Sequence, residues 1–518
     1  MSTTIEAIKN NKKESLIYCS LIFIGSLVFR LYYFPYDLPV VVDGLDYFFY
    51  ATEISMLQNL PQNWIVINSG WPIFLSFWFS VIQLEGTQQY MELQKVLTVV
   101  LSSATIVPVY LICKNFVDVK YAIIGAILFG IDPRIVLNSL LGSTDPLYIL
   151  LGAISLVLLL KNDKKFTYLA FVFAAFCTIV RGEGIFLVLA ITIIFFIKNK
   201  INFESVKIFI PSIIIFSVIL IPILLQRIEI SGSDGVFLRV SQAAIETSVA
   251  ANTDKYQNIF SGLELFFKYL IWVLIPNFIL FVPLMIIYFI KTRLKENKFI
   301  IIFLTIMSIP ALYAYMVPAQ DTRYLYFLFP MFTLLSVIII SKYLDKNKFK
   351  NYLILLLISG IIISSILFFE YKKDDWRMNN KIEIINMKVA EEIISIADGV
   401  NLHPTEARYI RALQIPNEWP YYYNEIEFKT QSIAWSDEQS IKNFIKQNER
   451  KLTHIIVDDN DTLPKFLSDI HHNEEKFNFL ILEKNYEQLG YNNKLKIFKI
   501  DYEQFNIMYE QEMGLKGN

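Results

Sequence analysis

Two aspartates three positions apart, Asp43 and Asp46, follow the first long apolar segment of the chain. Charged side chains in or beside a bilayer are costly and are usually kept for function. Their spacing places both carboxylates on one face of a helix, beside the aromatic run 47–50. A carboxylate next to a reacting hydroxyl can take its proton as a general base. We therefore predict that this pair carries the chemistry of the protein.

Other roles are open to the same residues. Acids in the first turn of a helix stabilise its N-terminus, and a run of aromatic residues suits a membrane–water interface. An Asp-x-x-Asp pair can also hold a divalent cation such as Mg²⁺ or Mn²⁺ through oxygen ligands. We favour catalysis for Asp43, whereas for Asp46 catalysis and helix capping remain alternatives.

The elements that position these acids are membrane spans. Of the 518 residues, 54% are hydrophobic and only 18% are charged, and the net charge is -1. This composition indicates a polytopic α-helical membrane protein and gives no field that would attract nucleic acid. The criterion of about 20 apolar residues per span predicts about eleven spans. They cover residues 15–33, 93–113, 121–137, 146–160, 166–180, 184–197, 208–226, 269–290, 299–317, 324–341 and 352–369.

Basic loops give the orientation. Lysine and arginine cluster before the first span and after the second, fourth, sixth, eighth and tenth spans. Because basic loops stay in the cytoplasm, the N-terminus is predicted to be cytoplasmic in a multi-pass plasma-membrane protein. The first loop, 34–92, then lies outside. Its apolar stretch 70–84 is too short to span without inverting every later loop, so we expect an interfacial helix there.

The composition changes at residue 370. We expect a transmembrane domain over 1–369 and a soluble, extracytoplasmic α/β domain over 370–518. Helical periodicity over 382–396 and 441–445 alternates with apolar strand-like runs at 452–457, 479–482 and 495–500. The acidic cluster 458–461 suits a turn, and the four histidines lack the spacing of metal ligands. We therefore assign no metal site from these residues.

Several short motifs, taken in order, resemble membrane glycosyltransferases of the GT-C superfamily. The chain is similar to the dolichyl-phosphate-mannose protein mannosyltransferase and aminoarabinose transferase group over roughly residues 15–370. The resemblance rests on Asp43-x-x-x-Tyr47-x-x-x-Ala51, on Gly70-Trp-Pro-Ile-Phe74, on Ser143-Thr-Asp-Pro-Leu147, and on Arg323-Tyr-Leu-Tyr326 with Pro330. Two departures stand out: Gly44 replaces the glutamate of the usual Asp-Glu pair, and the Trp-Trp-Asp-Tyr-Gly signature of oligosaccharyltransferases is absent.

The resemblance implies a GT-C-like fold and a reaction. The donor is a sugar on a polyprenyl (dolichyl) phosphate reached from the membrane, and the acceptor is a hydroxyl of a protein or glycolipid on the outer face. Asp43, helped or replaced by Asp46, is the expected base of an inverting transfer. The expected contacts to the donor and its phosphate are Arg323, Arg181, Arg134, Tyr47 and Asp145. For the arginines the alternative is snorkelling to lipid headgroups, and for Tyr47 an aromatic belt.

Three further functions remain open. The first is a transferase that works in lipid-linked glycan assembly, or an oligosaccharyltransferase-like enzyme. The second is a lipid or solute transporter, although transporters usually hold charges at mid-membrane, whereas these acids lie outside. The third is an inactive scaffold that presents the C-terminal domain. The sugar, the acceptor, the metal dependence and the oligomeric state do not follow from the sequence.

Overall fold

The structure is a computed structural model. It describes residues 2–41, 43–62, 65–66, 68–84, 86–161, 163–232, 259–292, 298–316, 321–381, 383–384, 387–388, 390–391, 400–402, 430–432, 441–447, 449, 452–457, 465–485 and 496–512.

The chain divides into two compact units. The first comprises Met1–Pro35, Val42–Phe79 and Leu93–Lys373, and the second comprises Tyr36–Val41, Ser80–Glu92 and Asp374–Asn518. The C-terminal unit thus begins four residues after the expected boundary at 369/370, and it takes in two pieces of the expected first loop.

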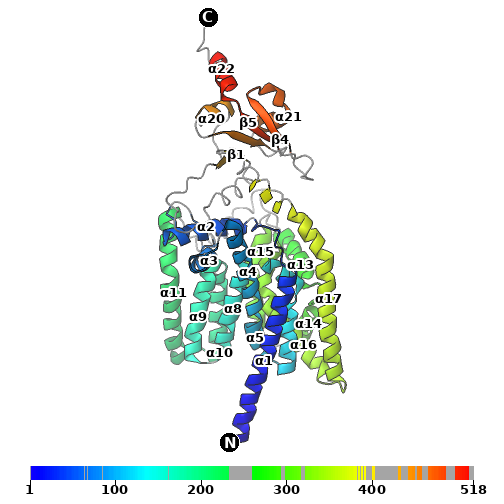
Figure 1. Ribbon diagram of the computed structural model, residues 1–518. Helices are drawn as coiled ribbons and strands as arrows, with labels where there is room; N and C mark the ends of the chain where they lie inside the picture. Colours follow the sequence, from blue (N-terminus) through cyan, green and yellow to red (C-terminus); the bar gives the residue numbers. More distant parts are fainter. Residues whose placement is uncertain are drawn as a thin grey trace. The chain divides into compact units, whose positions relative to one another are not determined.

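The first unit is helical (Figure 1). In chain order the helices up to residue 379 are α1 (Ser2–Tyr32), α2 (Asp43–Leu57), α3 (Gly70–Val81), α4 (Thr87–Ala104), α5 (Ile106–Lys114), α6 (Val119–Gly130), α7 (Pro133–Ser139), α8 (Asp145–Leu160), α9 (Lys164–Val180), α10 (Gly184–Asn199), α11 (Phe203–Ser231), α13 (Ile259–Leu274), α14 (Phe281–Thr292), α15 (Lys298–Met316), η1 (Thr322–Leu328), α16 (Phe329–Leu344) and α17 (Lys350–Asn379).

All the expected spans fall on these helices. Within the described residues, five helical segments are long and apolar enough to cross a bilayer, or six if the bent pair α6 and α7 forms one span. The five are Thr87–Lys114, Phe203–Ile230, Lys298–Met316, Thr322–Leu344 and Lys350–Arg377. Apolar helices of 10–17 residues, among them Asp145–Leu160 and Gly184–Asn199, accompany them. The protein is therefore a polytopic helical membrane protein.

Two expected spans are not continuous helices. The segment 121–137 bends by 51° between α6 and α7, because Asp132 caps a new helix that has Pro133 in its first turn. The segment 269–290 is divided between α13 and α14. Pro276 lies just beyond α13 and disfavours helical backbone at the residue before it.

Loops that the charge pattern assigns to one side meet in the structure. Lys120, after the second span, donates to Asn351 after the tenth at 3.2 Å. Lys198, after the sixth span, donates to the carbonyl of Leu160 at the end of the fourth at 2.8 Å. Each contact places two of these loops side by side, as the charge pattern predicts. The assignment of these loops to the cytoplasm stays a prediction.

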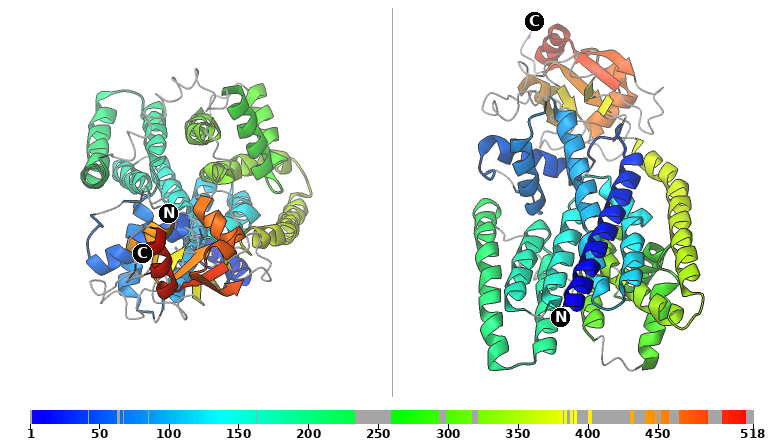
Figure 2. Two further views of the ribbon diagram at one scale, coloured as in Figure 1. Left: turned by 90° about the horizontal axis from the view of Figure 1, so that it is seen from above. Right: turned by 60° about the horizontal axis from the view of Figure 1, so that its bottom comes forward.

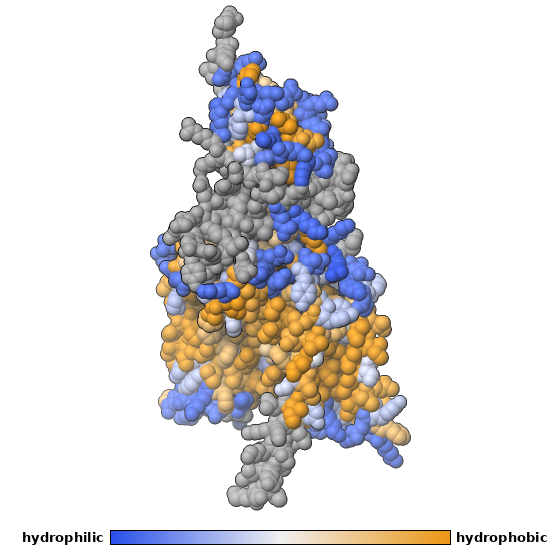
Figure 3. All heavy atoms as spheres, in the orientation of Figure 1, coloured by the Kyte–Doolittle hydropathy of each residue, from blue (hydrophilic) through white to orange (hydrophobic). Residues whose placement is uncertain are grey.

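One face of the helical unit carries an apolar band. On the face shown in Figure 3, hydrophobic side chains gather over the middle of the bundle and hydrophilic ones over the lower helix ends. The view along the bundle in Figure 2 places α11 and α17 at its periphery, and both expose large apolar side chains such as Val218 and Leu367. Exposed apolar surface of this extent suits lipid rather than water. Helix α2 lies across one end of the bundle (Figure 1).

The second unit contains a five-stranded mixed sheet in the order β2-β1-β3-β5-β4. Strands β1 (Val400–Leu402), β2 (Thr430–Ser432) and β3 (His454–Val457) are parallel, whereas β5 (Lys496–Ile500) is antiparallel to β3 and to β4 (Leu480–Asn485). Helices α20 (Ile441–Gln447), α21 (Lys465–His472) and α22 (Tyr502–Glu512) accompany the sheet. Its core includes Phe444, Ile455, Phe479 and Phe498.

The expected α/β character of the C-terminal part is confirmed. The three predicted strands correspond to β3, β4 and β5, and the predicted helix around Phe444 is α20. The sequence missed β1 and β2, which are only three residues long. Most of the periodic segment 382–396 and the acidic cluster 458–461 lie outside the described residues.

Candidate functional site

A cavity of about 540 Å³ opens in the helical unit at the N-terminus of α2. It is lined by Asp43, Asp46, Tyr47, Ile65, Val66, Asn68, Thr144, Arg181, Glu183, Arg323 and Tyr324. These residues come from five places in the chain: α2, the segment before α3, the turn before α8, the turn before α10, and η1. The volume lies in the range of small-molecule sites.

Arg323 stands on one wall of the cavity between two carboxylates. Asp321 caps η1 by accepting the backbone N–H of Arg323 at 2.9 Å, and it also accepts a hydrogen bond from Nε of the same residue. Nη2 of Arg323 lies 3.3 Å from Oδ2 of Asp43. Asp43 thus bridges from the first turn of α2 to η1, 280 residues further along the chain.

Arg181 is held more deeply. It follows the last residue of α9 and forms ion pairs with Asp145, whose side chain is 3% exposed, and with Glu183, at 3.1 Å from Nη2 to Oε1. Burial alone would lower the pKa of Arg181, but the charges of Glu183 and Asp145 raise it well above its usual value. Its guanidinium lies over the rings of Tyr148 and Tyr324. The cation is therefore permanently charged and fixed in place.

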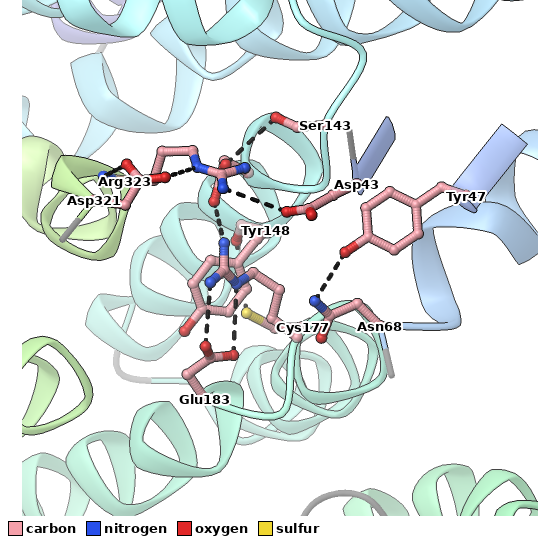
Figure 4. A network of polar contacts seen from close by, with 11 residues as sticks. Asp43, Tyr47, Asn68, Ser143, Tyr148, Cys177, Glu183, Asp321 and Arg323 are labelled. Carbon is pink, nitrogen blue, oxygen red and sulfur yellow. Dashed lines mark hydrogen bonds and ion pairs between the residues drawn. The ribbon is translucent and has the colours of Figure 1, made fainter. Parts of the chain in front are cut away.

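A neutral polar wall faces the arginines. Nδ2 of Asn68 donates to the hydroxyl of Tyr47 at 3.1 Å, and burial raises the pKa of Tyr47 to about 12. Figure 4 shows Tyr47 and Asn68 on the side opposite Asp321 and Arg323, with Asp43 between them. A neutral hydroxyl and a carboxamide are suited to binding the hydroxyl groups of a sugar.

The two walls touch through backbone. A Cβ added to Gly70, the first residue of α3, would lie 2.6 Å from the backbone nitrogen of Val180. Val180 directly precedes Arg181, so the start of α3 rests on the peptide that carries this cation. The residue before Gly70, Ser69, accepts a hydrogen bond at 2.9 Å from buried Arg227 on α11. These contacts fix the segment that presents Asn68 against the turn that presents Arg181.

Replacing Gly70 by alanine is therefore expected to displace Arg181. A methyl group against rigid backbone forces a shift, and overpacking of this kind costs about 1–3 kcal/mol. A displacement of about 1 Å at a reacting site can lower a rate by about 100-fold. We expect G70A to reduce the activity of the site by about 10- to 100-fold while the protein stays folded, as measured by turnover beside thermal unfolding in detergent.

Gly360→Ala is the matched control, because nothing lies within 4 Å of a Cβ added at Gly360 on α17. G360A should leave turnover unchanged. Equal turnover in G70A and G360A would show that the contact between Gly70 and Val180 does not position Arg181.

The structure brings together five of the seven residues expected at the site. Asp43, Asp46, Tyr47, Arg181 and Arg323 line the same cavity. The sixth, Asp145, reaches it through its ion pair with Arg181.

The seventh, Arg134, lies elsewhere. Its guanidinium lies 4.6 Å from the ring centroid of Trp272, and Nη2 donates to the Trp272 carbonyl at 2.9 Å. Its position in the first turn of α7, behind the Asp132 cap, turns it into the protein interior. Arg239, which the charge pattern also assigns to the outer side, is outside the described residues.

Six lining residues were not predicted as site residues: Ile65, Val66, Asn68, Thr144, Glu183 and Tyr324. Asn68 sits in a segment without regular structure, and no motif marks it. Tyr324 adjoins Arg323, and this adjacency was the available signal. As to metals, no group of three His, Cys, Asp or Glu side chains able to hold an ion occurs in the part of the chain that the structure describes. We therefore derive no step through a metal.

No protein-family model matches the chain, and no curated protein matches its sequence. Solved structures do match. ArnT from Cupriavidus metallidurans, bound to undecaprenyl phosphate, aligns with a TM-score of 0.55 at 9% identity over 94% of this chain and 98% of its own. The apo oligosaccharyltransferase of Archaeoglobus fulgidus aligns with a TM-score of 0.54 at 12% identity over 86% of this chain and 69% of its own.

The same oligosaccharyltransferase in complex with Zn and sulfate gives a TM-score of 0.52 at 12% identity, over 84% of this chain and 68% of that one. Both neighbours are membrane glycosyltransferases of the GT-C fold. The expected fold is thus confirmed, and at these identities the likeness concerns the fold alone.

Proposed function

We propose that this chain, which has the GT-C fold, transfers a sugar from a polyprenyl-phosphate donor to an acceptor hydroxyl at the outer face of the plasma membrane. The observation that carries the proposal is that Arg181, Arg323, Asp43 and Asp46 all line one cavity. The arginines can bind a phosphate, and the aspartates can remove a proton. The proposed topology follows the basic loops, with the N-terminus in the cytoplasm and the C-terminal unit outside.

The chain's residues divide the work of the reaction. Arg323 and Arg181 bind the donor phosphate through planar, charge-assisted hydrogen bonds. Asp43 takes the proton of the acceptor hydroxyl as its oxygen attacks the anomeric carbon from the face opposite the phosphate. The bond from that carbon to the phosphate oxygen breaks, and its electron pair leaves with the polyprenyl phosphate. The anomeric configuration is inverted. Asp145 holds Arg181 in place.

The charge of the site suits such a transition state. Beside the two arginines lie five carboxylates: Asp43, Asp46, Asp145, Glu183 and Asp321. Glycosyl transfer passes through an oxocarbenium-like state with positive charge on the sugar ring. Fixed negative groups around the ring stabilise that charge. Tyr47 and Asn68 are placed to bind sugar hydroxyls on the remaining wall.

The solved neighbours support a lipid-linked donor. The ArnT structure holds undecaprenyl phosphate, so a chain of this fold accommodates a polyprenyl phosphate. Protein and glycolipid acceptors both fit the proposal. A protein acceptor, as in protein mannosylation from a dolichyl phosphate, is favoured by the motif resemblance. The tethered acceptor peptide of the A. fulgidus enzyme supports, as a second candidate, an oligosaccharyltransferase-like reaction on a lipid-linked glycan.

A donor panel tests the proposal. The purified full chain in lipid nanodiscs is given polyprenyl phosphates that carry radiolabelled mannose, glucose, galactose or aminoarabinose, with a peptide library or membrane lipids as acceptor. Reactions are run with EDTA and with added Mg²⁺ or Mn²⁺, because Asp43 and Asp46 offer two carboxylates.

We expect label from one donor class to move to an acceptor with inversion of the anomeric centre. Consumption of no donor under any of these conditions would overturn the proposed function and would favour a transporter or an inactive scaffold.

A further inference from the structure

The proposed base, Asp43, and the proposed phosphate ligand, Arg323, are in direct contact in this structure. Oδ2 of Asp43 and Nη2 of Arg323 are 3.3 Å apart. In an inverting transfer the sugar ring must fit between the group that removes the proton and the group that holds the leaving phosphate. Inverting glycosidases separate their two carboxyl groups by about 6.5–9.5 Å to make that room. The closed pair therefore leaves no space for the reacting sugar between Asp43 and Arg323.

We propose that the Asp43–Arg323 ion pair is a resting-state lock that the phosphate of the donor opens. This inference rests on the proposed function and adds an order of events to it. The donor phosphate displaces Asp43 from Arg323, and the released carboxylate then becomes available to the acceptor hydroxyl. The donor binds first, and without it Asp43 is not available as the base. When the polyprenyl phosphate leaves, Asp43 returns to Arg323.

Arg323 interacts electrostatically with buried Asp145 and forms ion pairs with Asp321 and Asp43. The two ion pairs differ in how firmly they hold the guanidinium. Asp321 accepts both the backbone N–H and Nε of Arg323, so it fixes the residue whether or not a ligand is present. Asp43 contacts only Nη2, and its side chain is 49% exposed. Partly exposed ion pairs are weak. A phosphate that binds the guanidinium bidentately forms the stronger contact.

Arg181 is built as a fixed anchor instead. Its carboxylate partner Asp145 is almost fully buried and accepts a further contact from Ser143 at 3.4 Å. Opening that pair would leave a buried charge without its partner, which is strongly unfavourable. The exchange is thus confined to Arg323, while Arg181 keeps the same position before and after donor binding.

The lock predicts how Asp43 substitutions change the affinity for a phosphate that carries no sugar. Farnesyl phosphate is titrated into the purified full chain in detergent micelles, and the Kd is measured by calorimetry. Removing the competing carboxylate in D43N should tighten binding by about three- to fivefold, the upper part of the range of a partly exposed pair. D43E keeps the competitor and should bind much as the wild type does. Size-exclusion chromatography confirms that each variant is folded.

D46N controls for bulk charge. Asp46 lines the same cavity, so its neutralisation changes the field by a similar amount without freeing Arg323, and its Kd should stay within about twofold of the wild type. Equal tightening in D43N and D46N, or no tightening in D43N, would overturn the lock while leaving sugar transfer intact. Loss of farnesyl phosphate binding in every form, wild type included, would instead overturn the phosphate site and with it the proposed function.

Discussion

Replacing Asp43 by asparagine is expected to slow sugar transfer by about 10²–10⁴-fold, the usual contribution of a general base. Asparagine keeps the size of the side chain and can still accept a hydrogen bond, but it cannot take a proton. The fold should survive, because among the residues that the structure describes Asp43 forms one partly exposed ion pair, which contributes little stability. The measurement is the initial rate of label transfer from the donor identified in the panel.

The pattern of the kinetic constants sharpens this prediction. If Asp43 also competes with the donor phosphate, D43N lowers kcat while KM for the donor stays the same or falls. D46N is the matched comparison, since Asp46 shares the helix and the cavity. A normal rate in D43N together with a large loss in D46N would move the base to Asp46. Normal rates in both variants would contradict base catalysis by this pair.

The sequence predicted the parts of the site that depend on local signals. Asp43 and Asp46 stand in the first turn of a helix, where acids are favoured, and Arg181 and Arg323 each adjoin an apolar segment and an acid. Alternation of the basic loops placed all four on one side of the membrane. Residues on the same side of the membrane can meet, so the charge pattern restricts the candidate partners of Asp43 to one set of loops. The four residues do line one cavity.

The sequence could not predict contacts that depend on tertiary packing. Arg134 satisfied the same sidedness rule, but the Asp132 cap directs it towards Trp272. Asn68 lies two residues before the Gly70-Trp-Pro-Ile-Phe74 motif but is not part of it. Its place opposite Arg323 follows from the contact of Gly70 with the backbone of Val180. The break in 269–290 is a further case, since an apolar run shows where a segment prefers lipid and not whether its helix is continuous.

Arg30 is the clearest example of a residue whose contacts the sequence could not predict. In the sequence it stands near the end of the first apolar segment, where an arginine ordinarily reaches for headgroups. In the structure its side chain is 0% exposed. It donates to the Gly130 carbonyl at 2.6 Å, to Ser102 Oγ at 3.1 Å and to Ser139 Oγ at 3.2 Å, and so it joins α1 to α4, α6 and α7.

The charge of Arg30 has a buried counterpart. Asp132, also fully buried, interacts electrostatically with it from the bend between α6 and α7. Asp132 is in turn the cap of α7 and accepts a hydrogen bond from Asn277, beyond the end of α13. Where the helices bend, backbone and side-chain polar groups remain inside the bundle, and in lipid they need partners from the protein. Arg30 and Asp132 supply them.

Arg30→Met should therefore destabilise the helical unit by about 3–5 kcal/mol, because it removes the donor of several buried polar groups and a cation that interacts with buried Asp132. The readout is the thermal unfolding midpoint in detergent. Val28→Ala on the same helix is the control, since Val28 is 60% exposed and its loss should shift the midpoint little. Asp132→Asn added to R30M should recover part of the loss, because a neutral asparagine needs no cation in place of Arg30. Equal midpoints for R30M and V28A would show that this cluster does not hold the bundle together.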